Sequence, residues 1–463
     1  MEDGMMMEEA PQILDGPFNR MISIPPVAGS TVSLEAQYVN AIIKTGINSS
    51  GLGYHSAGIL GPTIQVNTGE IFQANLSNAL GEPTNVHWHG LLTPAGMDGH
   101  PADLIGAGGN FIYSFPVINR AGMYWYHAHP DLLTAKQAYL GLAGFFRISD
   151  TEEQALGMPS GDFEIPVVIQ DKLLRYNDNL EYSPGMMDVM NGLLGDHVLV
   201  NGIHAPFLDV ATRIYRLRIL NGSNGRIYNL SLSNGSSFAI IGTDGGLLAS
   251  TEITSNILLS PGERVDVLID FSGLEVGTEI FLQSATFSGS EYQGKQSFKI
   301  LKFVIDRMES DSYSIPSTLS SYEVISESQS VRNRTFDISN GGGHGGHGGG
   351  MFVHNINGKS YNENFIDETV LAGTTEIWTF DNTIGIDPHP MHLHGAIFQV
   401  LDRTGGREQL FAHERGWKDT VLVMPGEKVR VIVQFGQNKG VYVFHCHNLE
   451  HEDSGMMLQM EIK

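Results

Sequence analysis

Short alternating runs of apolar and polar residues recur along the chain, and glycine, proline and asparagine separate them. Two clear examples are Val429–Val433 and Arg264–Ile269, which are rich in the β-branched side chains that favour strands. Helical periodicity is scarce, and Asp131–Tyr139 is one segment that could form a short helix. This pattern predicts an all-β protein built from sandwiches or barrels.

A sequence repeat relates the two ends of the chain. Near the start, His-Trp-His-Gly at 87–90 precedes His-Ala-His at 127–129. Near the end, His-Leu-His-Gly at 392–395 precedes His-Cys-His at 445–447 in the same order. Residues 215–230 form a weaker copy without histidines. The repeat therefore predicts three related domains, which we expect at residues 1–150, 151–320 and 321–463.

Composition agrees with a turn-rich β protein of this size. The 463 residues are enough for about three domains. Glycine is abundant (55 residues) and only 17% of residues are charged, which favours strands and turns over helices. The net charge of -24 opposes binding to nucleic acid or to an anionic membrane, because both need a basic face. No apolar run reaches transmembrane length, and no export signal is visible at the start.

Histidines are concentrated in four clusters. Ten of the 18 histidines belong to them: His87 and His89; His127 and His129; His389, His392 and His394; His445, His447 and His451. Because residues i and i+2 of a strand point to the same side, each His-X-His presents two imidazoles to one face. A single such motif is equally compatible with a polar strand face. Four of them supply eight imidazoles, more than a zinc site needs, and predict a cluster of several metals.

Cys446, the only cysteine, lies between two of these histidines. Its side chain must face away from the cluster that His445 and His447 face, which predicts a second metal site directly behind the first. His389, His451 and Met456 complete a set of two histidines, one thiolate and a weak axial thioether, typical of blue copper. We expect Pro390 to break the strand alternation and so free His389 from the face used by His392 and His394.

The four motifs HWHG, HAH, HPMHLHG and HCHNLEHEDSGMM resemble those of the multicopper oxidases, in particular the bacterial three-domain laccases and cuprous oxidases. The resemblance extends from about Gly61 to the C-terminus. It implies three tandem cupredoxin-like Greek-key domains that hold four copper ions. The ligand set that it implies is His389, Cys446, His451 and Met456 for type 1 copper; His87 and His392 for type 2; and His89, His127, His129, His394, His445 and His447 for the type 3 pair.

The resemblance also implies a reaction. A substrate gives electrons one at a time to the type 1 copper, near His451 or His389 at the surface, and Cys446 passes them to the other coppers, where dioxygen becomes water. Asp98 and Glu452 occupy the positions of the family's proton-relay acids. The alternative for both is a carboxylate that only holds ligand imidazoles by hydrogen bonds.

Two rivals accompany our reading of a laccase-like oxidase of phenols and aromatic amines. The first is a metallo-oxidase of Cu(I) or Fe(II) in copper resistance, which a methionine-rich cover over the blue copper would favour. This chain offers only the Gly341–Gly350 segment with its neighbours Met351 and His354, which could collect Cu(I) or serve as a linker. The second is a scaffold protein without turnover, which the complete ligand set opposes, since buried imidazoles without metal would stay unsatisfied.

The remaining expectations concern context. Both halves of the metal cluster lie in one chain, so we expect a monomer to be sufficient. We expect an extracytoplasmic protein whose export signal is absent from this chain, with a cytoplasmic one as the alternative. Asp419 should have a structural hydrogen-bonding role, and we expect purely structural roles for five histidines outside the motifs, which are His55, His100, His197, His204 and His413.

Overall fold

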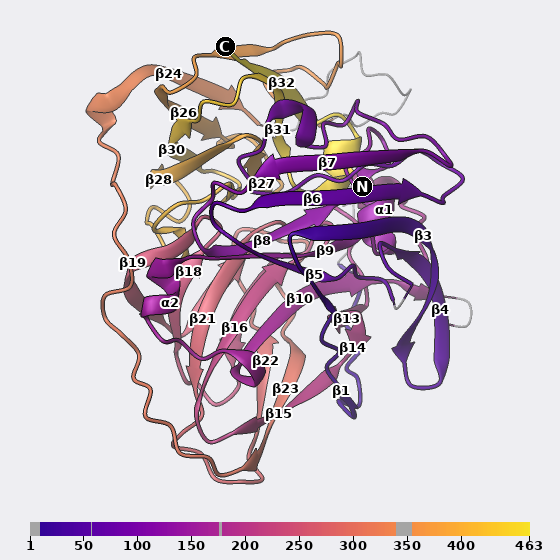
Figure 1. Cartoon of the computed structure of the whole chain (residues 1–463), viewed down its shortest axis with the longest axis vertical. Coiled ribbons are helices and arrows are strands. Elements are labelled where there is room, and N and C mark those ends of the chain that lie inside the picture. Colours follow the sequence, from indigo (N-terminus) through magenta and orange to yellow (C-terminus); the bar gives the residue numbers. More distant parts are fainter. Residues whose placement is uncertain (1–9, 57, 176–177, 339–353) are drawn as a thin grey trace, which may run out of the picture.

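Strands dominate the computed structural model, which describes residues 10–56, 58–175, 178–338 and 354–463. The prediction of an all-β protein is confirmed. The larger sheets form three pairs that follow one another along the chain. Figure 1 shows them as an indigo-to-purple, a magenta-to-salmon and an orange-to-yellow part, with the first and last in contact above the middle one. The predicted domain limits remain predictions.

The first pair of sheets spans residues 27–149. Its core forms because the strands alternate: in β3, Val32, Leu34 and Ala36 are buried, whereas the residues between them face outward. Phe72 and Trp88 meet edge to face at 4.9 Å within this core. In order of pairing, the two sheets are β4 (Ile47–Gly53), β3 (Thr31–Lys44), β6 (Ile71–Asn78) and β7 (Asn110–Pro116); and β2 (Val27–Ala28), β5 (Thr63–Asn67), β9 (Ala143–Ser149) and β8 (Gly122–His127).

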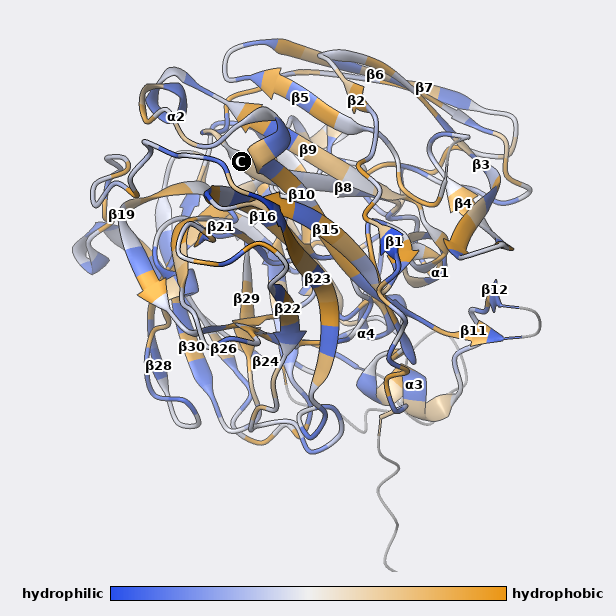
Figure 2. Ribbon diagram, turned by 90° about the horizontal axis from the view of Figure 1, so that it is seen from below, coloured by the Kyte–Doolittle hydropathy of each residue, from blue (hydrophilic) through white to orange (hydrophobic). Residues whose placement is uncertain are grey.

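The middle pair contains the predicted strand Arg264–Ile269 within β21. Its first sheet is β1 (Arg20–Met21), β15 (Pro206–Ala211), β23 (Phe298–Arg307), β22 (Glu279–Ser284), β17 (Tyr228–Leu232) and β20 (Asn256–Leu259). Its second sheet is β14 (Ile203–His204), β13 (His197–Val200), β10 (Glu164–Lys172), β16 (Ile214–Asn221), β21 (Arg264–Asp270), β18 (Phe238–Thr243) and β19 (Gly246–Thr254). The early strand β1 pairs with β15, so the N-terminal segment joins the middle sheets. Figure 2 shows how apolar residues line β10, β15, β16 and β23.

The third pair contains the predicted strand Val429–Val433 within β30. A long connection, residues 308–329, leads to it along one side of the molecule (Figure 1). The sheets are β24 (Ser330–Asp337), β26 (Thr375–Asp381), β30 (Lys428–Phe435) and β28 (Ala396–Thr404); and β25 (Glu368–Val370), β32 (Met457–Ile462), β31 (Gly440–Cys446), β27 (His389–Leu393) and β29 (Thr420–Val423).

The helices are short, and α1 (Thr134–Leu140), α3 (Met186–Asn191) and α4 (Leu449–Asp453) meet at one junction. The expected helix near Asp131–Tyr139 is confirmed as α1, and α1 and α3 both pack against α4. Asp453 of α4 accepts hydrogen bonds from the backbone of Thr134 and Ala135, which joins the first and third parts. None of the helices among the described residues has the length and hydrophobicity to span a bilayer.

The helical elements are α1 (Thr134–Leu140), α2 (Thr151–Ala155), α3 (Met186–Asn191) and α4 (Leu449–Asp453), with single 3₁₀ turns η1 (Ala95–Met97), η2 (Gly161–Phe163), η3 (Glu327–Gln329) and η4 (Ala412–Glu414). A small hairpin joins β11 (Leu174–Arg175) to β12 (Asn179–Leu180).

Gly90 and Gly395 each directly follow a His-X-His motif, and both have a positive φ, +83° at Gly90 and +65° at Gly395. A Cβ on Gly90 would lie 2.4 Å from Asp419 Oδ2 and 2.7 Å from Arg264 Nη2. We therefore expect Gly90→Ala to lower the free energy of unfolding by about 1–3 kcal/mol, because a left-handed backbone is strained for alanine. Urea denaturation measures this. The control is Gly96→Ala, where nothing lies within 4 Å of a new Cβ; equal losses in both variants would contradict the prediction.

Candidate metal centres

Eight imidazoles from the first and third parts of the chain converge in one buried cluster. His87 and His127 bond to each other through their backbones, with N–O distances of 2.8 and 3.1 Å. On the other side, His392 of β27 lies opposite His445 of β31 in the sheet register. All eight side chains are buried. An isolated β-bridge and a strand pair, far apart in sequence, thus aim their rings at the same point.

Three of the rings direct their Nε2 atoms at one another. The Nε2 of His445 lies 3.3 Å from that of His129 and 3.1 Å from that of His394. The three ligand atoms all lie within 4.8 Å of one another. An ion held by three imidazoles needs this arrangement of three nitrogens around one centre.

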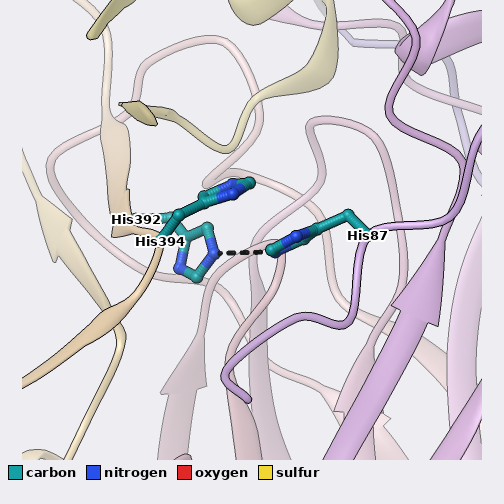
Figure 3. Close-up of side chains that lie close together, drawn as sticks. All are labelled: His87, His392 and His394. Atoms are coloured by element: carbon teal, nitrogen blue, oxygen red, sulfur yellow. Dashed lines mark hydrogen bonds between the residues drawn. The ribbon is translucent and has the colours of Figure 1, made fainter. Parts of the chain in front are cut away.

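A second group joins His87 and His392. Their Nε2 atoms are 3.5 Å apart, as the dashed line in Figure 3 shows, and the ring of His394 stacks on that of His87. The Nδ1 atoms of His87 and His392 donate to the carbonyls of Asp98 (2.7 Å) and Asp419 (2.9 Å). These bonds fix the tautomer, so each ring presents the lone pair of Nε2 to a metal.

The third group consists of His89, His127 and His447. His89 Nδ1, His127 Nε2 and both ring nitrogens of His447 are buried and have no hydrogen-bond partner among the described residues. Buried polar atoms of this kind are rare, because each lost hydrogen bond to water costs free energy. Metal coordination would satisfy them. The donor set therefore fits copper, which binds imidazole well.

Protonation of these rings also suits a metal centre. Burial, together with the charges of neighbouring imidazoles, lowers the pKa of His87, His89, His129, His394 and His447 well below its usual value. Burial lowers the pKa of His127 to about 3. The rings are therefore neutral at physiological pH, which is the form that binds metal ions.

A second centre lies behind β31. Cys446 Sγ is 3.4 Å from His389 Nδ1 and 3.6 Å from His451 Nδ1, and these two nitrogens are 3.2 Å apart. Met456 is buried in the same core, and its carbonyl accepts a hydrogen bond from the Cys446 backbone. Burial raises the pKa of the Cys446 thiol. A cation in this site would favour the thiolate, the form that binds copper.

The expectation that Pro390 breaks the strand was wrong. β27 runs unbroken from His389 to Leu393, with Pro390 opposite Leu422 in the register. His389 leaves the face of His392 and His394 through ordinary alternation, because it lies three positions, an odd number, before His392. In the same register Met391 lies opposite Cys446, on the side of the second centre.

Both predicted proton-relay acids lie against ligand rings. Asp98 Oδ2 accepts from His394 Nδ1 at 2.7 Å, and Oδ1 accepts from Thr93 at 3.0 Å. Burial raises the pKa of Asp98 to about 8. Glu452 has its oxygens 3.1 Å from His445 Nδ1 and 3.4 Å from His129 Nδ1, without the alignment of a hydrogen bond.

Asp419 has more contacts than a general structural role requires. Its carboxylate accepts from His89 Nε2 at 3.0 Å and receives two bonds from Arg264 of β21, at 2.7 and 2.5 Å. Burial opposes its ionisation, but the Arg264 guanidinium outweighs this and holds the pKa of Asp419 well below its usual value. The middle sheets thereby orient a histidine of the cluster. The sequence indicated no such role for Arg264, because the contact joins strands distant in sequence.

The expectation that electrons enter near His451 or His389 at the surface was wrong about exposure: both rings are fully buried. His451 Nε2 donates to the Met190 carbonyl of α3 at 2.8 Å, and the ring of His354 stacks on it at 3.7 Å. Helix α3 contains Met186, Met187 and Met190. The motif Met-Met-Asp-Val-Met was visible in the sequence, but its position did not indicate that it would cover His451. The rest of the Gly-His segment, residues 339–353, lies outside the described residues.

The contacts of Asp419 lead to a metal-affinity prediction. Asp419→Asn removes the charge that orients His89, and we expect the protein's copper affinity to fall by about 10–100-fold. Copper content measured against a competing chelator tests this. The matched control is Asp306→Asn, whose carboxylate pairs only with the exposed Arg307. Wild-type affinity in the Asp419 variant would refute the orienting role.

Comparison with known proteins agrees with this geometry. Residues 35–153 and 328–463 each match a family model described as multicopper oxidase. A laccase of Bacillus subtilis is 35% identical in an alignment of 415 positions that covers 82% of this chain and 79% of that protein. The crystal structure of a multicopper oxidase from Aquifex aeolicus has a TM-score of 0.88 at 33% identity and covers 96% of this chain and 99% of its own. A multicopper oxidase from Campylobacter jejuni, described as a metallo-oxidase, has a TM-score of 0.84 at 28% identity, with 99% of each chain covered. The chain belongs to the multicopper oxidase family.

Proposed function

We propose that this protein is a laccase-like oxidase, which removes electrons one at a time from phenols or aromatic amines and reduces dioxygen to water. The observation that carries the proposal is the position of Cys446. It contributes to one centre, while its neighbours His445 and His447 contribute to the other. When bound, copper would take up and release single electrons and bind dioxygen. The chain itself supplies a covalent path of one residue between the two centres.

The proposed ligand set has four copper ions in one chain, so a monomer would suffice. The close groups His129, His394 and His445, and His389, Cys446 and His451, support part of it. For His89, His127 and His447 the support is their buried ring nitrogens that lack other partners among the described residues. The ligands are His389, Cys446, His451 and Met456 for type 1 copper; His87 and His392 for type 2; and His89, His127 and His447, with His129, His394 and His445, for the type 3 pair.

Asp98 and Glu452 are the proposed proton carriers. Reduction of dioxygen to water consumes protons, which must cross a buried shell to reach the cluster. The Asp98 carboxylate accepts a hydrogen bond from His394, and the Asp98 backbone carbonyl accepts one from His87. The raised pKa of Asp98 lets its carboxyl hold a proton near neutral pH. Glu452 lies beside His129 and His445.

A second candidate, a Cu(I) or Fe(II) metallo-oxidase, is favoured by one observation. Helix α3, with three methionines, covers His451. Thioethers are soft ligands that suit Cu(I). Met186 is 58% exposed, so a metal ion in solution can reach this helix.

Steady-state oxidation of 2,6-dimethoxyphenol, compared with Cu(I), separates the two candidates on copper-loaded protein with a blue absorption band. For a laccase we expect strong turnover of the phenol without added copper. Phenol turnover that needs excess copper, together with fast Cu(I) oxidation, would assign a metallo-oxidase. Absence of the blue band and of oxygen uptake with either substrate would refute the enzyme assignment.

The raised pKa of Asp98 gives a pH prediction. A carboxyl that donates a proton works in its acid form, so kcat should fall as pH rises through this pKa. The positive charge of bound copper lowers the pKa from about 8, which moves the decline to lower pH. We expect Asp98→Asn to lack this decline and to lower kcat by about 10²–10⁴-fold.

The control for Asp98→Asn is Glu291→Gln, a change at a largely exposed carboxylate. Copper content is measured in both variants, because loss of metal would also lower kcat. An Asp98 variant with full copper, wild-type kcat and an unchanged pH profile would exclude proton supply by this residue.

A further inference from the structure

We propose that His354 is a positioning residue of the type 1 centre. The ring of His354 seals His451 from water and so keeps the reduction potential of the bound copper high. This inference rests on the proposed function, because it concerns the copper that would receive electrons from the substrate. His354 matches no ligand motif of the chain, and its sequence neighbours suggest a linker or a segment that collects Cu(I).

The contact between the two rings is close and nearly parallel. The centroids of His354 and His451 are 3.7 Å apart, with 21° between the planes. His354 is only 3% exposed and His451 is fully buried. The imidazole of His354 therefore occupies the space from which water would otherwise reach one face of the ligand ring.

Helix α3 anchors both rings through neighbouring carbonyls. His354 Nε2 donates to the carbonyl of Val189 at 3.1 Å, and His451 Nε2 donates to that of Met190 at 2.8 Å. Since the two acceptors are consecutive in the helix, the pair of rings is held at a fixed separation. Each donor bond also fixes which nitrogen of its ring carries the proton.

The seal involves the whole centre and not His451 alone. The ring of His354 is 6.2 Å from that of His389, the other imidazole beside Cys446. Asn448 also lies at His451 Nε2, at 3.2 Å. The Nε2 atom of His451 already has hydrogen-bond partners, and His354 covers one face of the His451 ring. Removal of His354 would therefore open a route for water to His451.

Exclusion of water has a known electrostatic consequence. Oxidised copper carries one more positive charge than reduced copper, and water stabilises the more highly charged form. A dry shell around a metal site therefore raises its reduction potential, and solvent entry lowers it. The stacked ring excludes water, whereas a smaller or more flexible side chain at 354 would admit it.

Three variants separate the ring from its hydrogen bond. His354→Ala removes both, His354→Gln keeps a donor for Val189 without a ring, and His354→Phe keeps an aromatic ring without the donor. The reduction potential of the type 1 copper is measured by redox titration of the blue band in copper-loaded protein, together with its EPR spectrum. His204→Phe, at a histidine that packs on His197 instead, is the control.

We expect a lower potential and an altered EPR signal in His354→Ala and His354→Gln, with His354→Phe and His204→Phe close to the wild type. If His354→Ala fails to fold, the potentials of His354→Gln and His354→Phe are compared instead and decide whether the ring is needed. Equal potentials in the wild type, the Gln and the Phe variants would overturn the inference. A wild-type protein that binds copper without a blue band would instead overturn the proposed function.

Discussion

Strand alternation at β31 is the constraint on which the arrangement of the site depends. Successive residues of a strand face opposite sides, so His445 and Cys446 cannot contribute to the same centre. The partner strand β27 obeys the same rule in register, with His392 opposite His445 and Met391 opposite Cys446. One strand pair therefore offers candidate ligands to two centres whose separation is set by the thickness of the backbone. A metal cluster carried on loops alone would have no such fixed spacing.

The middle part of the chain contains no predicted ligand, yet two of the contacts that shape the centres come from it. Arg264 of β21 holds the Asp419 carboxylate that orients His89, and α3 offers carbonyls to His451 and His354. These contacts join side chains that are rigid because they are buried and paired. The middle part thus acts as a scaffold that fixes ring orientation from outside the cluster. The copy of the repeat in this middle part has no histidines, which is compatible with a scaffold role, since positioning needs hydrogen bonds and not metal ligands.

Much of this was visible in the sequence, and the rest depends on contacts that sequence spacing does not encode. The repeat and the β-branched runs predicted the fold class, and the alternation of His445 and Cys446 predicted two separate groups of ligand atoms. Spacing could not reveal that Arg264 reaches Asp419, because that contact depends on how separate sheets pack. The burial of His451 was missed for the same reason: its cover comes from α3 and His354, both remote in sequence. The prediction for Pro390 was wrong because a proline usually interrupts a central strand, whereas here β27 continues through Pro390.

Burial of so many imidazoles opposes folding unless something satisfies them. The pKa values of the rings are lowered, so the folded chain binds fewer protons than the unfolded chain as pH falls, and acid destabilises it. The unpartnered nitrogens of His127 and His447 add a desolvation cost that no hydrogen bond among the described residues offsets. A metal that binds only the folded state would recover both terms, since it requires neutral rings and fills their free lone pairs. Stability and metal affinity are therefore linked in this chain: the features that make the cluster selective for metal are those that weaken the fold without it.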